Sequence, residues 1–452
     1  MAKQAENYLP KVRQQYEEFP YPDRNPKEER QRFIISWMAR MDSVNHRCYA
    51  GQQPFRDFRV LVAGGGTGDS AIAWAEQLRG RGDSKVVYLD LSDASAAIAK
   101  RRAEIRGLDN IEWISDSILN IPALNMEPFD FIDCTGVLHH LEDPDAGLNA
   151  LKSVLKPDGA MNLMVYGRYG RTAVYQVQDL MRLVNGDEEN PRKQISNAKK
   201  VLESLPGHHW YNISQQVGWA YSDAKSNAGI FDLFLHTQDR SYTILEAHDW
   251  LERCGLKMVG EPGSNNVQEL YLPETHITDG KLLEQIKQYP RKVQQAIGEA
   301  TSTKVTMHEF YVTHKNAERR PAEITDTALV PWEGMMPLVT CAQLADLADQ
   351  HKDALTLTFD KVPGKPQVKV PKGKYIPTIL RQIDGERSIG EIITAVMLEP
   401  RFANNPPNET AVLAEFENLL VHMNRSNALF LRDKSIKPFP TIKDIESRVH
   451  TK

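Results

Sequence analysis

The clearest chemical signal in the 452-residue sequence is a glycine cluster with an acid downstream of it. Gly64, Gly66 and Gly68 stand at alternate positions, and Asp90 follows about twenty residues later. Glycines let the chain turn tightly and let a ligand lie against bare main chain. A helix that begins behind them offers unpaired N–H groups and a partial positive charge. The pattern predicts a nucleoside-binding site in which Asp90 accepts hydrogen bonds from ribose hydroxyls. A tight turn followed by a surface acid is the alternative.

The elements around these residues have the order that a nucleotide-binding βαβ unit requires. An apolar run at residues 60–63 has the composition of a buried parallel strand. A helical pattern follows the glycines and ends at Gly80 and Gly82, and a second strand at residues 85–89 leads to Asp90. The glycines are therefore expected in the turn between a strand and a helix.

Three more strands are predicted at residues 111–114, 129–134 and 160–165, with helices between them. Strands that alternate with helices through short turns imply an α/β fold with a parallel sheet and helices on both faces. Ligands of such sheets bind at the carboxyl ends of the strands. The loop at residues 166–171 is therefore expected on the substrate side.

The succession from residue 55 to 165 resembles the class I S-adenosylmethionine-dependent methyltransferases. The matching motifs are the glycine turn, Asp90, Asp116 with Ser117 after the third strand, the run GVLHHL, and the turn KPDG. The resemblance implies a Rossmann-like methyltransferase fold with a seven-stranded sheet and S-adenosylmethionine as cofactor. The cofactor contacts that it implies come from Gly64, Gly65, Gly66, Gly68, Asp90, Leu91, Asp116, Ser117, Thr135, Gly136 and, in the N-terminal arm, Tyr21.

One position departs from the family. Many members carry an acid two residues before the first motif glycine, where it helps to hold the methionine end of the cofactor, and this chain has Val62 there. We expect the aromatic, proline-rich segment at residues 19–26 to replace that contact. A dinucleotide-binding dehydrogenase is the competing interpretation, but its G-x-G-x-x-G spacing is absent and it gives Asp116 no role.

A second and weaker resemblance concerns the acceptor. The segments FPYPDRNP (19–26), YGRYGR (166–171) and LHTQDRSYT (235–243) are similar to a bacterial subgroup of non-SET protein-lysine methyltransferase-like proteins. This similarity implies a protein lysine as one acceptor, with a small molecule as the alternative. An S-adenosylmethionine-binding regulatory or assembly protein without turnover is the competing hypothesis.

Residues on the expected acceptor side include candidates for proton transfer. Methyl transfer from a sulfonium requires alignment of donor and acceptor, and an amine or hydroxyl acceptor also loses a proton to a base. Tyr166, His139 and His236 are the predicted catalytic residues, while Arg168 and Arg240 are candidates for binding a carboxylate or phosphate. The four cysteines form no CxxC pair, so no metal site is predicted.

Composition suggests several parts of the chain. Residues 1–50 are expected to form a helical arm or lid, with one helix from residue 26 to about 44. Residues 51–315 are the expected methyltransferase domain, with insertions at about 170–245 and 262–303. Residues 316–340 read as a linker, and residues 341–440 as a small α+β domain that resembles a winged helix.

Charge and hydropathy narrow the expected partners. The net charge of −5 gives no basic field, so nucleic acid is not an expected partner. Neither a membrane-spanning stretch nor a signal peptide is evident, which predicts a cytoplasmic protein. A homodimer is compatible with the sequence. The identity of the methyl acceptor is not determined by the sequence.

Overall fold

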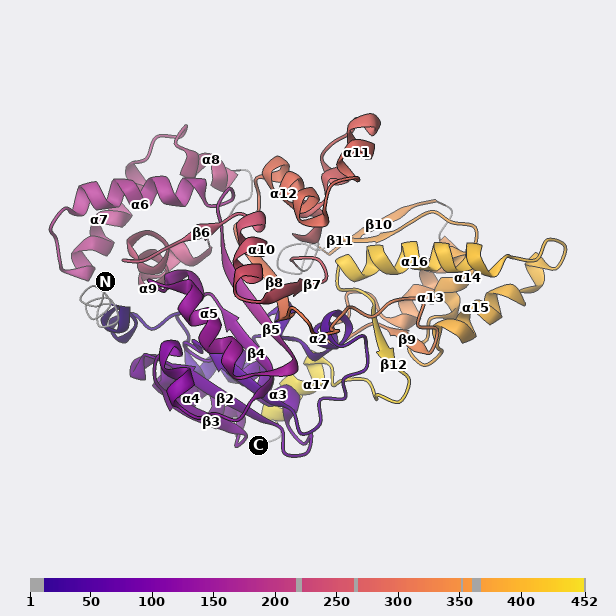
Figure 1. The fold of residues 1–452 in the computed structure, drawn as a ribbon, viewed down its shortest axis with the longest axis horizontal. Coiled ribbons are helices and arrows are strands. Elements are labelled where there is room, and N and C mark those ends of the chain that lie inside the picture. The colour runs from indigo at the N-terminus through magenta and orange to yellow at the C-terminus, as the bar shows by residue number, and fades with distance from the viewer. Residues whose placement is uncertain (1–11, 217–221, 264–266, 351–352, 360–366, 451–452) are drawn as a thin grey trace.

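The computed structural model describes residues 12–216, 222–263, 267–350, 353–359 and 367–450. A sheet of eight strands forms its centre, with the order β3-β2-β1-β4-β5-β8-β7 and β6 paired to the end of β5 (Figure 1). Its strands are β1 (Arg59–Ala63), β2 (Lys85–Asp90), β3 (Ile111–Ser115), β4 (Phe129–Thr135), β5 (Leu155–Gly167), β6 (Ser241–Tyr242), β7 (Leu256–Val259) and β8 (Met307–His314). Strands β1 to β5 are parallel, and β8 runs antiparallel to β5 and β7. The predicted Rossmann-like fold is confirmed, and β6 adds a short strand to the seven expected ones.

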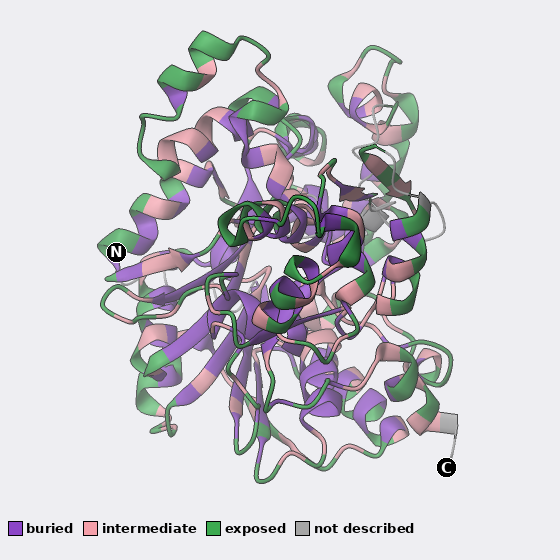
Figure 2. Cartoon of the chain, turned by 90° about the vertical axis from the view of Figure 1, so that its right-hand side faces the viewer, coloured by how far each residue is buried: buried purple, intermediate pink, exposed green. Residues whose placement is uncertain are grey.

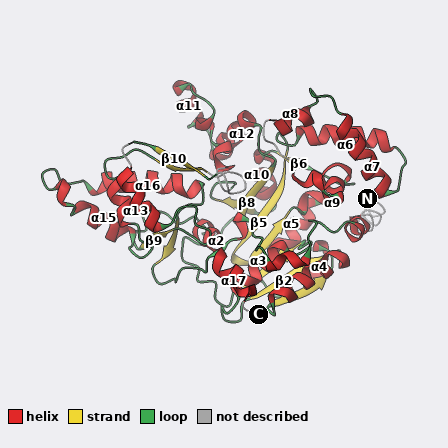
Figure 3. Ribbon diagram, turned by 180° about the vertical axis from the view of Figure 1, so that it is seen from behind, coloured by secondary structure: helices red, strands yellow, loops and turns green. Residues whose placement is uncertain are grey.

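Each face of the sheet carries its own apolar layer, because successive residues of a strand point to opposite sides. Val60 and Val62 of β1 pack on one face, and Leu61 and Ala63 pack on the other. The first face is covered by α2 (Met41–Cys48), α3 (Asp69–Leu78) and α4 (Asp93–Arg106). The second is covered by α5 (Pro144–Ser153) and α10 (Ile244–Arg253). Figure 3 shows the strands enclosed between these helices.

The helix predicted from residue 26 to about 44 is wrong. That stretch forms two 3₁₀ helices, Pro26–Arg30 and Trp37–Ala39, before α2 begins at Met41. Glu29 is buried and pairs with Arg102 and Arg106 of α4, so this part of the arm lies flat against that helix. A continuous helix could not follow that surface. Residues 1–11, which belong to the predicted arm, lie outside the described part of the chain.

Two insertions interrupt the second half of the sheet. The first contains α6 (Thr172–Asn185), α7 (Pro191–Ser204), α8 (Trp210–Gln216), α9 (Asn227–Ile230) and a π-helix (Phe231–Leu235). These helices share a small apolar core that also holds Phe19 of the arm. The second insertion lies between β7 and β8 and includes α11 (Gly280–Ile286) and α12 (Arg291–Ser302).

The C-terminal part forms a separate apolar core to one side of the sheet (Figure 1). Its elements are β9 (Leu329–Trp332), α13 (Cys341–Gln350), β10 (Leu355–Thr358), β11 (Gln367–Val370), α14 (Ile376–Gln382), α15 (Ile389–Met397), α16 (Glu409–Arg425) and β12 (Phe430–Asp433). Strand β9 falls within the expected linker and pairs with β12, so residues 329–332 belong to the C-terminal part, where Leu329 packs in its core while Trp332 packs with the core on the first face of the sheet. The chain then returns to the sheet through α17 (Ile442–His450), where Arg448 contacts Glu76 of α3. The winged-helix resemblance stays a prediction.

Burial follows this layered arrangement. Figure 2 shows buried strands through the centre, while the outer helices are exposed on their outward sides. Among the helices of the described ranges, none is long and apolar enough to cross a lipid bilayer.

Candidate active site

The turn after β1 holds its shape through glycine. Gly64 and Gly66 have φ of 74° and 49°, in the left-handed region that side chains disfavour. A Cβ at Gly66 would lie 2.6 Å from the carbonyl oxygen of Tyr21, and one at Gly65 would lie 2.3 Å from the Tyr88 ring. The turn therefore lies directly under the arm and has no room for side chains.

Two acids, Asp90 as the last residue of β2 and Asp116 directly after β3, accept hydrogen bonds from backbone N–H groups. The Asp90 carboxylate accepts hydrogen bonds from the amides of Gly66 (2.7 Å) and Ser92 (2.8 Å). Burial raises the pKa of Asp90, although these amide hydrogen bonds act in the opposite direction. Asp116 accepts from the amide of Ser117 and the side chain of Asn120, both at 2.7 Å. Each carboxylate keeps lone pairs for a ligand.

The N-terminal arm closes over this turn. The carbonyl of Tyr21 accepts from the amide of Thr67 (3.3 Å), and the carbonyl of Pro22 accepts from the Thr67 hydroxyl (2.7 Å). Arg24 then pairs with Asp69 at the start of α3 at 2.7 Å. Nearer its start, the arm accepts a hydrogen bond from the Ser92 hydroxyl at the carbonyl of Tyr16. The arm is thus fastened on both sides of the glycine turn.

These elements enclose a cavity of about 460 Å³ at the carboxyl ends of the parallel strands. The predicted site residues in its lining are Tyr21, Gly64, Gly65, Gly66, Asp90, Leu91, Asp116, Ser117, Thr135, Gly136 and Tyr166. Gly68 does not line it. Gly68 precedes α3 and packs against α4, where a Cβ would lie 2.7 Å from the Cβ of Ala99.

One wall of the cavity is a buried carboxylate with two phenols. Tyr166, at the end of β5, donates its hydroxyl to one oxygen of Asp232 (3.1 Å), and Tyr16 of the arm donates to the other (3.2 Å). Burial raises the pKa of Asp232 and of both tyrosines, so the phenols stay protonated and act as donors. Asp232 comes from the π-helix of the first insertion, which therefore completes the cavity.

A model of the "Methyltransferase domain" family matches residues 60–159. The chain is 39% identical over 190 residues to the tRNA 5-carboxymethoxyuridine methyltransferase of Escherichia coli, covering 42% of this chain and 69% of that protein. It is 33% identical over 185 residues to a ubiquinone biosynthesis O-methyltransferase of Actinobacillus pleuropneumoniae, covering 37% and 76%. The chain belongs to the class I S-adenosylmethionine-dependent methyltransferases.

Two longer matches extend beyond this methyltransferase core. An uncharacterized protein of Synechococcus is 29% identical over 247 residues, and this methyltransferase spans 58% of its length. The structure of PKMT2 from Rickettsia typhi in complex with AdoHcy has a TM-score of 0.59 at 14% identity, covering 85% of this chain and 73% of that one. At that identity the likeness shows a shared fold.

The cavity of this methyltransferase suits its cofactor. The glycine turn brings bare main chain to one side, and the anchored carboxylates of Asp90 and Asp116 stand at the ends of β2 and β3. A Cβ at Gly64 would lie 2.3 Å from the side chain of Val137, so Val137 packs directly against the turn and leaves no room for another side chain. The residues present fit S-adenosylmethionine.

Val62, which stands where many family members carry an acid, has an acidic neighbour that the sequence does not reveal. Asp133 of β4 pairs in register with Val62 and lines the same cavity. It is buried and accepts hydrogen bonds from Trp74 (3.1 Å), Thr135 (2.8 Å) and Asn162 (3.2 Å). A carboxylate is therefore present at this depth of the cavity, one strand away from its usual place.

The histidines differ from expectation. His139 is fully buried behind Tyr166, with its ring centroid 3.9 Å from the Tyr166 ring, and it does not line the cavity. His140 lines it instead, because the 3₁₀ turn Leu138–His140 points the two side chains in different directions. His139 therefore has no direct access to the cavity, and its catalytic role stays a prediction. His236 lies behind the wall and reaches the cavity through Tyr16, whose hydroxyl is 3.3 Å from its Nε2.

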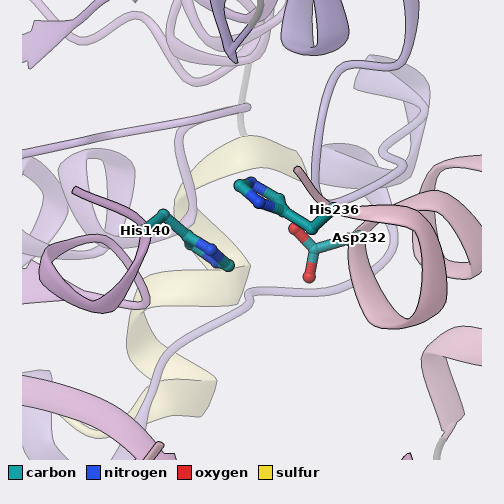
Figure 4. Close-up of side chains that lie close together, drawn as sticks. All are labelled: His140, Asp232 and His236. Atoms are coloured by element: carbon teal, nitrogen blue, oxygen red, sulfur yellow. The ribbon is translucent and has the colours of Figure 1, made fainter. Parts of the chain in front are cut away.

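Nitrogen and oxygen atoms of His140, Asp232 and His236 lie within 4.8 Å of one another (Figure 4). The two rings are stacked at 3.8 Å with planes 23° apart, so their in-plane lone pairs run side by side instead of converging. Both Nδ1 atoms are engaged by the backbone of Gln238, which donates to His236 (3.0 Å) and accepts from His140 (2.9 Å). The hydrogen-bond network thus assigns the proton of His236 to Nε2. The geometry fits a hydrogen-bonded cluster better than a cation site.

The arginines singled out from sequence lie elsewhere. Arg168 and Arg240 line a separate surface groove near α10, and Arg168 pairs with Glu246 at 2.8 Å. The arginine that lines the methyltransferase cavity is Arg171. The loop YGRYGR is predicted to lie at the substrate edge of the sheet, but its sequence does not show which of its two arginines enters the cavity.

Proposed function

We propose that this methyltransferase transfers the methyl group of S-adenosylmethionine to an oxygen of an acceptor that lies against Tyr166 and Asp232. The observation that carries the proposal is the buried carboxylate with two phenol donors on the wall of the cofactor cavity. When bound, S-adenosylmethionine supplies a methyl group already activated by the positive sulfur. The name of one relative, a ubiquinone biosynthesis O-methyltransferase, supports oxygen as the acceptor atom.

The cofactor contacts are assigned from the same cavity. Asp90 would hold the ribose hydroxyls, because its amide-anchored oxygens keep free lone pairs. Asp116 and Ser117, at the end of β3, would hold the adenine edge. Asp133 and the arm at Tyr21 would hold the methionine end, in place of the acid that Val62 replaces.

We assign proton transfer to the wall formed by Tyr166, Tyr16 and Asp232, which we call the acceptor wall. A hydroxyl acceptor bound beside Tyr166 would pass its proton to the phenol oxygen while Tyr166 passes its own proton to Asp232. The raised pKa of Asp232 makes it a better proton acceptor than an ordinary carboxylate. Tyr16, which is bonded to both Asp232 and His236, would hold the carboxylate in place.

Two other readings are outcomes of the same test. A protein lysine is implied by the weaker resemblance of the arm and loops, and an amine would lose its proton to the same wall. A regulatory or assembly protein would bind the cofactor and transfer nothing.

The experiment is transfer of a radiolabelled methyl group from S-adenosylmethionine into cell lysate by the full chain. The label is separated into small-molecule, RNA and protein fractions, and each is treated with alkali, which releases methyl esters as methanol and leaves ethers and methyl-lysine intact. Label in an oxygen product supports the proposal. Alkali-stable label on protein lysine would replace oxygen by nitrogen, and cofactor binding without label in any fraction would favour the regulator. Asp232→Asn is the matched control for background labelling.

A further inference from the structure

The cavity contains a buried guanidinium that the cofactor contacts do not use. Arg171 lines the cavity with its side chain only 5% exposed, and its guanidinium carbon lies 3.5 Å above the centre of the Tyr166 ring. Tyr166 belongs to the acceptor wall, so this positive charge lies beside the place where an acceptor would react.

Two donor atoms of Arg171 find no acceptor in the described part of the chain. Among the described residues, neither its Nε nor its Nη2 finds a hydrogen-bond partner, although both atoms are buried. Asp239 lies 3.7 Å from Nη2, which offsets the charge but is too long for a hydrogen bond, and Asp239 itself accepts from Gln178 at 2.8 Å. Buried donors without partners are rare because losing water without a replacement destabilises the fold. This arrangement is expected where a ligand supplies the missing acceptors.

The local backbone favours an anion as that ligand. Arg171 stands at the start of α6, a helix of 14 residues whose first turn has no side-chain cap and contains no acid. The partial positive charge of a helix N-terminus adds to that of the guanidinium. The planar fork of an arginine matches the two oxygens of a carboxylate.

We infer that Arg171 binds a carboxylate of the methyl acceptor, so that the acceptor of this enzyme is an acidic compound held between Arg171 and Tyr166. The inference rests on the proposed methyl transfer and narrows its substrate class. Leu233 and Val137 line the same cavity, which suits an apolar or aromatic body attached to that carboxylate. The carboxylate at the methionine end of the cofactor is the other group that could bind to Arg171 in the same way.

Phenoxyacetate and its neutral counterpart phenoxyacetamide are the probes. They are titrated by calorimetry into the full chain saturated with S-adenosylhomocysteine. We expect the acid to bind at least about tenfold more tightly than the amide, because hydrogen bonds to a charged partner are worth more than one factor of ten in affinity. In Arg171→Met this preference should vanish, and in Arg171→Lys a part of it should remain. Arg168→Met, in the same loop and outside the cavity, should keep the full preference.

Three results would overturn the inference. Equal binding of acid and amide to the wild type, or an unchanged preference in Arg171→Met, would show that the guanidinium does not read a carboxylate. The third is loss of affinity for S-adenosylhomocysteine in Arg171→Met while 5′-methylthioadenosine, which lacks the amino-acid end, still binds. That result would show that Arg171 binds the carboxylate of the cofactor instead of a carboxylate of the acceptor.

Retained binding of 5′-methylthioadenosine also shows that the variant is folded. The proposed function is tested separately by labelling of lysate. Undiminished labelling of the lysate acceptor by Arg171→Met, or labelling by a wild type that shows no carboxylate preference, would leave the methyl transfer standing and reject this site. A carboxylate preference in the wild type without any labelling of lysate would support the carboxylate site at Arg171 and reject the proposed methyl transfer.

Discussion

Apart from Tyr21 of the arm, the proposed cofactor half of the cavity comes from one stretch of chain, residues 64–136, whereas the proposed acceptor half joins Tyr16, Tyr166, Arg171 and Asp232 from distant elements. In the cofactor half, backbone amides donate to the carboxylates of Asp90 and Asp116. In the acceptor half, side chains hold one another, as the two phenols hold Asp232. The first half therefore depends mostly on local backbone geometry, while the second depends on both the arm and the insertion keeping their positions. Single substitutions should separate turnover from cofactor binding.

The largest expected effect is on the acceptor side. Asp232→Asn keeps the volume and a hydrogen-bonding oxygen but removes the proton acceptor, so the rate of methyl transfer to a hydroxyl should fall about 10²-fold or more. The affinity for S-adenosylhomocysteine, measured by calorimetry, should stay within about twofold, since Asp232 makes no contact with the glycine turn in the proposed arrangement. Glu299→Gln, a buried acid outside the cavity, is the control. Equal losses of rate in the two variants would reject a specific role for Asp232.

The next effect belongs to the cofactor side. Asp90→Ala removes a charged acceptor that is already oriented by two amides, and cofactor affinity should weaken at least about tenfold. Calorimetry with S-adenosylhomocysteine measures it. Asp93→Ala, an exposed acid three residues further on, should change the affinity little. An unchanged affinity in Asp90→Ala would show that the ribose is held elsewhere.

A smaller effect is expected where the arm joins the two halves. Tyr16→Phe deletes one hydroxyl that contacts Asp232 and His236, and it leaves the ring in place. Losing one hydrogen bond to a carboxylate should slow methyl transfer about tenfold at most, with unchanged cofactor affinity. Steady-state kinetics with the labelled acceptor distinguishes the two quantities. A drop in cofactor affinity instead would mean that Tyr16 acts mainly by holding the arm over the glycine turn.

The smallest effect should come from His139→Phe. Its ring is buried behind the wall, and neither ring nitrogen has a hydrogen-bond partner within the described segments, so an apolar ring should keep the rate and alter the free energy of unfolding by no more than about 1 kcal/mol. A large loss of turnover would support the predicted catalytic role of His139.

The same variant tests a dependence on pH. Burial, together with the charges of His140 and Arg171, lowers the pKa of His139 well below 6.5. Below about pH 6.5 the unfolded chain therefore binds a proton at His139, whereas the native state does not. The contribution of His139 to stability is complete above that pH and is lost as the pH falls. Thermal unfolding between pH 7.5 and 5.5 should show a shallower decline in His139→Phe. The decline should not vanish, since burial also lowers the pKa of His236.

Most of the sheet could be predicted because each strand is a local apolar run next to a turn signal. The arm could not, since the buried pairing of Glu29 with Arg102 and Arg106 overrides a helical pattern with contacts more than seventy residues away. Strand β9 falls in the segment that the sequence predicts as a linker for a similar reason, because its partner β12 lies about a hundred residues further along the chain. The choice between Arg168 and Arg171 also needed the structure, since both belong to one loop and only its backbone path decides which side chain enters the cavity.

The sequence by itself determined the family and the cofactor, and it predicts which residues form the cofactor half of the site. Its glycines and acids act through backbone geometry that neighbouring residues impose, so their spacing carries the information. Only the tertiary structure brought Asp232 and Tyr16 to Tyr166, and only it showed that Asp133 stands in register with Val62. These residues come together because an arm and an insertion pack onto the sheet, and the spacing of residues along the chain does not encode that packing.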